Sequence, residues 1–146
     1  MIKFEKIPAD VQQRLPSVAK ALEEDPRILF AYLFGGFAGG EPKPLSDIDV
    51  AVYLVTTECL AETKLDLFET LSDLFGTSEI DLVILNAAPL SLAGRILQKK
   101  RLLVDKEPHQ RHRFESLTLR KYFDFRKKEE ALFAQRYGVN PSPPRE

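Results

Sequence analysis

The chain has 146 residues, of which 44% are hydrophobic and 29% are charged, as in an ordinary soluble globular protein that can bury one core. No apolar run approaches the roughly 20 residues that a membrane-spanning helix needs, and the first ten residues contain no apolar signal-peptide core. The single cysteine, Cys59, cannot form an internal disulfide. We therefore expect a cytoplasmic protein.

The net charge of −1 hides an uneven distribution of charge. Residues 95–128 contain twelve Lys/Arg and four Asp/Glu, which gives a local charge of +8. The rest of the chain contains nine Lys/Arg and eighteen Asp/Glu, which gives a local charge of −9. A basic segment of this kind predicts a charged partner or ligand, although a solvated basic helix face is the alternative. The overall pI of about 6.2 argues against nucleic acid as the main partner.

The apolar pattern predicts helices alternating with short buried strands. The predicted elements in chain order are a helix at 10–25, strands at 28–34 and 48–54, a helix at 58–75, a strand at 79–85, a helix at about 89–99, a strand at 101–105 and a helix at about 110–137. Pro16 is expected to kink or restart the first helix. Four glycines and two prolines predict an irregular loop at 35–46.

These elements predict an α/β (α+β) fold in which helices cover a mixed, mostly four-stranded sheet. The 24 residues from Val55 to Ser78 leave room for a helical crossover, so the strands at 48–54 and 79–85 should be parallel. We expect one domain over residues 1–137, ending in the long helix, and a disordered Pro-rich tail at 138–146.

Three carboxylates mark one end of the predicted sheet. Asp47 and Asp49 are two residues apart and should point to one face, and Asp81 lies near the start of the third strand. If these strands are parallel neighbours, the three carboxylates converge, which is costly unless a cation neutralises them. Oxygen ligands of this type suit Mg²⁺. The alternative is structural: Ser46 and Asp47 cap a turn, and Asp81 is an ordinary acid at a strand end.

A metal site beside a glycine loop is typical of enzymes that transfer a nucleotidyl group from a nucleoside triphosphate. The pattern Gly35-Gly36-x10-Asp47-Ile48-Asp49, followed by EIDLVIL at 79–85, resembles the signature of the nucleotidyltransferase superfamily, which has a polymerase beta-like fold. Its short form, SDIDVAV, is similar to the minimal nucleotidyltransferases (MNT), the antitoxins of HEPN–MNT toxin–antitoxin pairs. The resemblance covers about residues 25–105.

The resemblance implies roles for particular residues. Asp47 and Asp49 would bind two Mg²⁺ ions. Asp81 would complete the site of one of these ions and serve as the base. The nucleotide-binding residues would be Gly35, Gly36 and Ser46, with ATP as substrate.

Two positions depart from the family pattern. The family usually has Ser where this chain has Gly36, and often has Arg where it has Gly39. Each loss removes about 1–3 kcal/mol of ligand stabilisation, by analogy with hydrogen bonds to charged groups. The metal site therefore looks intact, while the phosphate-binding loop looks depleted. Lys43 is a candidate source of replacement charge, or a solvated loop lysine.

The resemblance also implies a protein acceptor, because no second helical domain follows residue 137 to complete an acceptor pocket. The expected activity is transfer of AMP to a tyrosine of a HEPN ribonuclease toxin in a hetero-oligomer. The alternatives are an MNT-fold module that neutralises its partner by binding alone, and a stand-alone enzyme with a small acceptor.

The last predicted helix carries more aromatic surface than one core-facing stripe needs. Its apolar residues are Phe114, Leu117, Leu119, Tyr122, Phe123, Phe125, Leu132 and Phe133. Aromatic residues interleaved with Arg and Lys are typical of protein interfaces. The alternative is that the sheet buries all of them.

Overall fold

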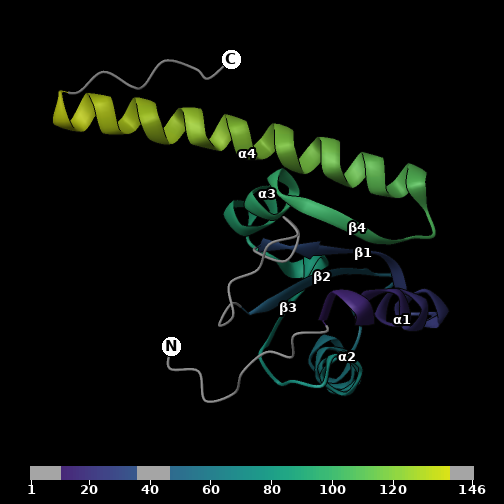
Figure 1. Ribbon diagram of the computed structural model, residues 1–146. Helices are drawn as coiled ribbons and strands as arrows, with labels where there is room; N and C mark the ends of the chain where they lie inside the picture. The colour runs from purple at the N-terminus through teal and green to yellow at the C-terminus, as the bar shows by residue number, and fades with distance from the viewer. Residues whose placement is uncertain (1–10, 36–46, 139–146) are drawn as a thin grey trace.

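A computed structural model describes residues 11–35 and 47–138. In these parts a four-stranded sheet lies between two layers of helices (Figure 1). The elements are α1 (Val11–Glu24), β1 (Ile28–Phe34), β2 (Ile48–Leu54), α2 (Leu60–Phe75), β3 (Ile80–Ile84), the short 3₁₀ turn η2 (Leu85–Ala87), α3 (Leu90–Gln98), β4 (Lys100–Asp105) and α4 (Pro108–Tyr137). No helix in the described parts is long and apolar enough to cross a membrane.

The strands have the spatial order β3-β2-β1-β4. β2 and β3 pair in parallel, whereas β1 is antiparallel to both β2 and β4, so the predicted mixed sheet and the parallel β2–β3 pair are confirmed. β1 therefore ends at the edge of the sheet where the other three strands begin. All three predicted carboxylates belong to this edge.

α1 and α2 pack on one face of the sheet (Figure 1). The buried stripe of α1 consists of Val11, Leu15, Val18 and Leu22. Pro16 lies inside this helix, which continues through it, so the helix does not restart there, and the alternative of a kink at Pro16 stays a prediction. The physical reason is that Pro16 is on the exposed side, while buried contacts on both sides of it hold the helix together.

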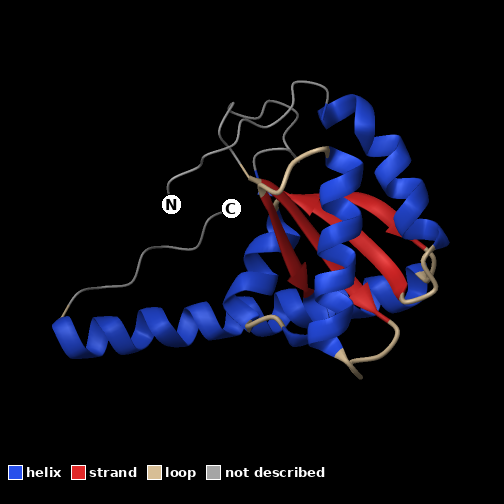
Figure 2. Cartoon of the chain, turned by 90° about the horizontal axis from the view of Figure 1, so that it is seen from below, coloured by secondary structure: helices blue, strands red, loops and turns tan. Residues whose placement is uncertain are grey.

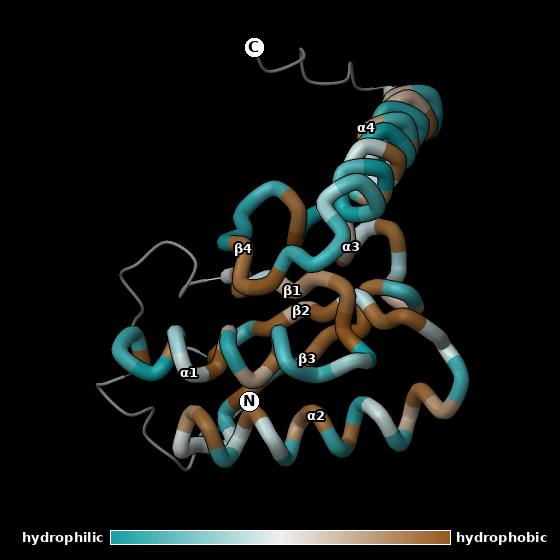
Figure 3. The backbone as a smooth tube through the Cα atoms, turned by 90° about the vertical axis from the view of Figure 1, so that its right-hand side faces the viewer, coloured by the Kyte–Doolittle hydropathy of each residue, from teal (hydrophilic) through white to brown (hydrophobic). Residues whose placement is uncertain are grey.

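α3 and α4 cover the opposite face, over a second core that includes Phe30, Tyr32 and Ile96. The two helices approach closely at Gly94, because a Cβ added there would overlap the Tyr122 ring. Figure 3 shows the hydrophobic residues gathered on the strands and on the inner sides of the helices.

Helix α4 is longer than the sheet that it covers (Figures 1 and 2). Its only buried side chains are Thr118 and Tyr122, so the alternative in which the sheet buries all of its apolar residues is wrong. Its exposed large hydrophobic residues are Leu117, Phe123, Phe125, Leu132, Phe133 and Tyr137. We call the last three of these, Leu132, Phe133 and Tyr137, the distal apolar patch.

The ends of several elements differ from the predicted ends by one or two residues. α2 begins at Leu60 rather than at residue 58, because Cys59 adopts a left-handed conformation with φ of 55°. α4 begins at Pro108 rather than at 110, because proline is well suited to the first turn of a helix.

Candidate active site

One row of residues crosses the sheet at the edge where β1 ends. Phe34 pairs with Asp49 of β2 on one side and with Lys100 of β4 on the other, and Asp49 pairs in turn with Asp81 of β3. Neighbouring strands are about 4.8 Å apart, so the backbones of Asp49 and Asp81 are direct neighbours. Paired residues project to the same face, which is the face that α3 and α4 cover.

Gly35 makes room for the Asp49 carboxylate. It follows β1 with φ of +69°, and a Cβ added at this position would overlap Oδ2 of Asp49. A glycine is therefore required at position 35 for two reasons: its backbone is left-handed, and the Asp49 carboxylate occupies the space that a side chain at position 35 would need. Gly35 is thus part of this edge, as the sequence predicted, but the observed contact is with Asp49.

The three predicted acids differ in exposure. Asp47 and Asp49 are half-buried, and Asp81 is exposed. Within residues 11–35 and 47–138, no three His, Cys, Asp or Glu side chains are arranged to hold a metal ion as they stand. The backbone register thus brings Asp81 beside Asp49, but the predicted convergence of three carboxylates is not present. Shared metal binding would require side-chain rotation, which is open to the exposed Asp81.

The donor set fits a hard cation. Asp47, Asp49 and Asp81 provide carboxylate oxygens at one edge, and the missing side chain at Gly35 leaves Asp49 room to reach it. Mg²⁺ prefers such ligands and retains positions for water and phosphate. Asp47 and Asp49 would hold the ion together with Asp81 of the neighbouring strand.

Lys100 closes the other end of the row and belongs to a polar network under α4. Its Nζ lies 3.3 Å from Oε2 of Glu115 and 5.6 Å from the centre of the Tyr32 ring. The Tyr32 hydroxyl donates a 2.7 Å hydrogen bond to the same Glu115 oxygen. Burial, and then the Glu115 carboxylate, raise the pKa of Tyr32 far above its usual value.

Arg111 completes this network from the first turns of α4. It donates hydrogen bonds to Glu115 Oε1 at 2.9 Å and to Asp105 Oδ2 at 3.0 Å. These contacts fix the N-terminal half of α4 to β4 and β1, beside the row of candidate residues. Sequence reasoning missed Phe34 and Lys100 as members of this row, because the β1–β4 pairing cannot be read from strand length and composition.

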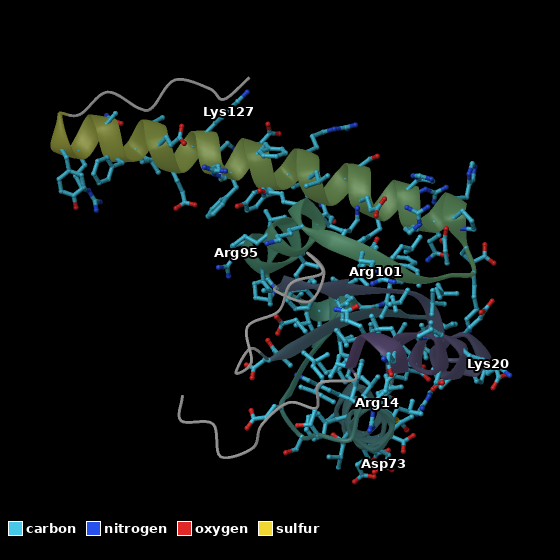
Figure 4. The ribbon with its side chains drawn as sticks, in the orientation of Figure 1. Arg14, Lys20, Asp73, Arg95, Arg101 and Lys127 are labelled. Atoms are coloured by element: carbon cyan, nitrogen blue, oxygen red, sulfur yellow. The ribbon has the colours of Figure 1, made fainter. Side chains whose placement is uncertain are left out.

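The basic segment 95–128 maps to the α3, β4 and α4 side of the molecule. Figure 4 shows Arg95, Arg101 and Lys127 on this side and Asp73 on α2 at the opposite side. The basic residues of this segment therefore lie together on one side of the sheet, while Arg14 and Lys20 are basic residues on the opposite side. The predicted site residues Gly36 and Ser46, as well as Gly39 and Lys43, lie outside the described residues.

The family model for polymerase beta nucleotidyltransferases matches residues 17–109. The chain belongs to this nucleotidyltransferase family. The match runs from α1 to the start of α4 and contains the whole row from Asp81 to Lys100. Most of α4 lies beyond it. No curated protein sequence matches the chain.

Several solved structures share the nucleotidyltransferase fold of this chain. A mutant of the toxin–antitoxin pair MntA–HpeT has a TM-score of 0.69 and 22% identity, over 83% of this chain and 96% of that chain. A tri-AMPylated Shewanella oneidensis HEPN toxin in complex with MNT antitoxin has a TM-score of 0.65 and 22% identity, over 85% and 96%. A toxin–antitoxin with AMP-PNP has a TM-score of 0.58 and 21% identity, over 86% and 93%.

Proposed function

We propose that this nucleotidyltransferase is the antitoxin of a HEPN–MNT pair and transfers AMP from ATP to a tyrosine of its HEPN toxin, with Mg²⁺. The single observation that carries the proposal is the pairing of Asp49 with Asp81 beside Gly35, at one edge of the sheet. The similar solved structures support the choice of partner, since they include an MNT antitoxin with a tri-AMPylated HEPN toxin. The pair would act in the cytoplasm.

The residues at the sheet edge would divide the work as follows. Asp47 and Asp49 would hold the divalent cations, which would neutralise triphosphate charge. Asp81, the most exposed of the three acids, accepts the proton of the tyrosine hydroxyl. The hydroxyl oxygen forms a bond to the α-phosphorus of ATP, the bond from that phosphorus to the bridging oxygen breaks, and pyrophosphate leaves.

A second candidate function is neutralisation of the toxin by binding alone. The departures at Gly36 and Gly39 favour it, because they remove a hydroxyl and a cation that the family uses near the triphosphate. The exposed apolar residues of α4 suit a binding role equally well. The two functions share the partner and differ in whether the partner is covalently modified.

Mass spectrometry of the partner separates these functions. The HEPN partner is incubated with this protein, ATP and Mg²⁺. We expect the partner to gain the mass of one or more adenylyl groups, and Asp49→Asn to abolish the gain. Gly36→Ser should increase the rate of transfer. An unmodified partner that is nevertheless inhibited would support binding alone.

A further inference from the structure

The long side of β3 that faces away from β2 borders a groove, which opens beside Asp81. Its volume is about 420 Å³. One wall is the start of α2, with Leu60, Ala61 and Lys64, and the other contains Pro89 and Leu92. The residues of β3 from Asp81 to Ile84 form the floor. The groove therefore runs along a strand and reaches a candidate active-site acid.

The backbone of β3 offers unused hydrogen-bonding groups to this groove. The Glu79 carbonyl accepts a 3.0 Å hydrogen bond from the Ile48 N–H, which fixes the alternation along the parallel ladder. The Glu79 carbonyl and the backbone groups of Asp81 and Val83 face β2, so both backbone groups of Leu82 and the N–H of Ile84 face outward, whereas the Ile84 carbonyl begins the 3₁₀ turn η2. No described strand pairs with this side, because β3 is the last strand of the sheet.

We propose that this groove binds an extended segment of the protein acceptor, which adds to the sheet as a strand beside β3 and brings its hydroxyl to Asp81. Main-chain hydrogen bonds to both backbone groups of Leu82 and to the Ile84 N–H would hold the segment, and the apolar walls would receive alternate side chains. Lys64 is exposed and makes no ion pair with described residues, so an acidic side chain of the segment fits opposite it.

A peptide suits this site better than a small acceptor does. The floor is a strand edge about 10 Å long between Asp81 and Ile84, at about 3.3 Å per residue, and its polar groups have the spacing of a polypeptide. Strand addition satisfies those groups with matching partners, whereas a compact ligand leaves most of them to water. This inference rests on the proposed transfer to a protein partner.

Amide hydrogen exchange tests the docking independently of catalysis. The probe is the HEPN partner, added without nucleotide. We expect exchange at Leu82 and Ile84 to slow at least tenfold on binding, with little change at Val83, whose amide already bonds to β2. Unchanged exchange at Leu82 and Ile84 in the complex, or full protection of both in the free protein, would overturn the proposal.

A steric variant tests the groove during transfer. Ala61→Arg places a long side chain on the α2 wall, and Ser17→Arg makes the same kind of change at an exposed position of α1. At low partner concentration we expect Ala61→Arg to lower the transfer rate at least tenfold by raising KM, and Ser17→Arg to leave it unchanged. Equal rates for both variants would refute the groove. Protection of Leu82 and Ile84 without any transfer by the native protein would refute the proposed function and leave the groove standing.

Discussion

Gly35 and Asp49 share one space at the edge of the sheet, because the carboxylate of Asp49 lies where a Cβ at position 35 would be. This contact joins the turn after β1 to the first acid of β2. It explains why a glycine stands at the end of an otherwise continuous apolar strand. It also gives a way to disturb Asp49 without changing any charge.

Gly35→Ala should displace the Asp49 carboxylate and lower nucleotidyl transfer at least tenfold. It should also reduce the free energy of unfolding by roughly 1–2 kcal/mol, since φ at Gly35 is left-handed. Gly138→Ala is the matched control, because its φ is +68° and nothing lies within 4 Å of an added Cβ. Equal losses of transfer in the two variants, measured with the partner, would show that the contact with Asp49 is unimportant.

The Tyr32–Glu115 hydrogen bond should contribute to the attachment of α4. Tyr32→Phe removes the 2.7 Å bond to a half-buried carboxylate and should lower the free energy of unfolding by about 1.5–3 kcal/mol, measured by urea denaturation. Tyr53→Phe is the control, because Tyr53 packs its ring against Phe30 and no described group bonds to its hydroxyl. A loss of stability as large in Tyr53→Phe would argue against the hydrogen bond as the cause.

Asp25 should make stability depend on pH at the acid end. The Arg27 side chain donates a hydrogen bond from Nη2 to Asp25 Oδ2 at 2.8 Å and lowers the pKa of Asp25 below its usual value. The unfolded chain binds the proton more readily, so this stabilisation is present above about pH 4 and is lost as the pH falls through the lower folded pKa. Asp25→Asn should flatten the acid limb of the stability curve. Asp73→Asn, at an exposed carboxylate without a described ion pair, should leave it unchanged.

The distal apolar patch on α4 should contribute to partner binding. Leu132 is 65% exposed and Phe133 is 54% exposed, at the end of α4 that extends past the sheet (Figure 2). Phe133→Asp should weaken binding of the HEPN partner at least tenfold in calorimetry, with little change in stability, because the ring has few contacts to lose. Gln135→Asp introduces the same charge two residues away and should have a much smaller effect. Identical affinities for both variants would place the interface elsewhere.

Strands and helices could be predicted closely from this sequence because each follows a simple pattern. The buried runs ILFAYLF and IDVAVYL became β1 and β2, and the crossover between β2 and β3 requires a parallel pair. Of the two predicted effects of Pro16, a kink or a restart, the restart does not occur, because tertiary packing of α1 outweighs one missing hydrogen bond. Local pattern predicts elements well where packing and propensity agree.

The site could be predicted only in part. The register of Asp49 with Asp81 follows from two parallel strands that begin with similar residues. Two features depend on the antiparallel pairing of β1 with β2 and β4: the contact of Gly35 with Asp49 and the position of Lys100. The register of these pairings cannot be predicted from the composition of the strands. The network of Tyr32 with Glu115 joins residues 83 positions apart and requires the packing of α4.

Binding of Mn²⁺, a paramagnetic substitute for Mg²⁺, tests the central claim most directly. In an amide-resolved NMR titration with ATP present, we expect saturable broadening centred on Gly35, Asp49 and Asp81, and the loss of that binding in Asp49→Asn. Broadening that centres on the Asp105–Glu115 network, or equal binding by Asp49→Asn, would contradict a metal site at the sheet edge.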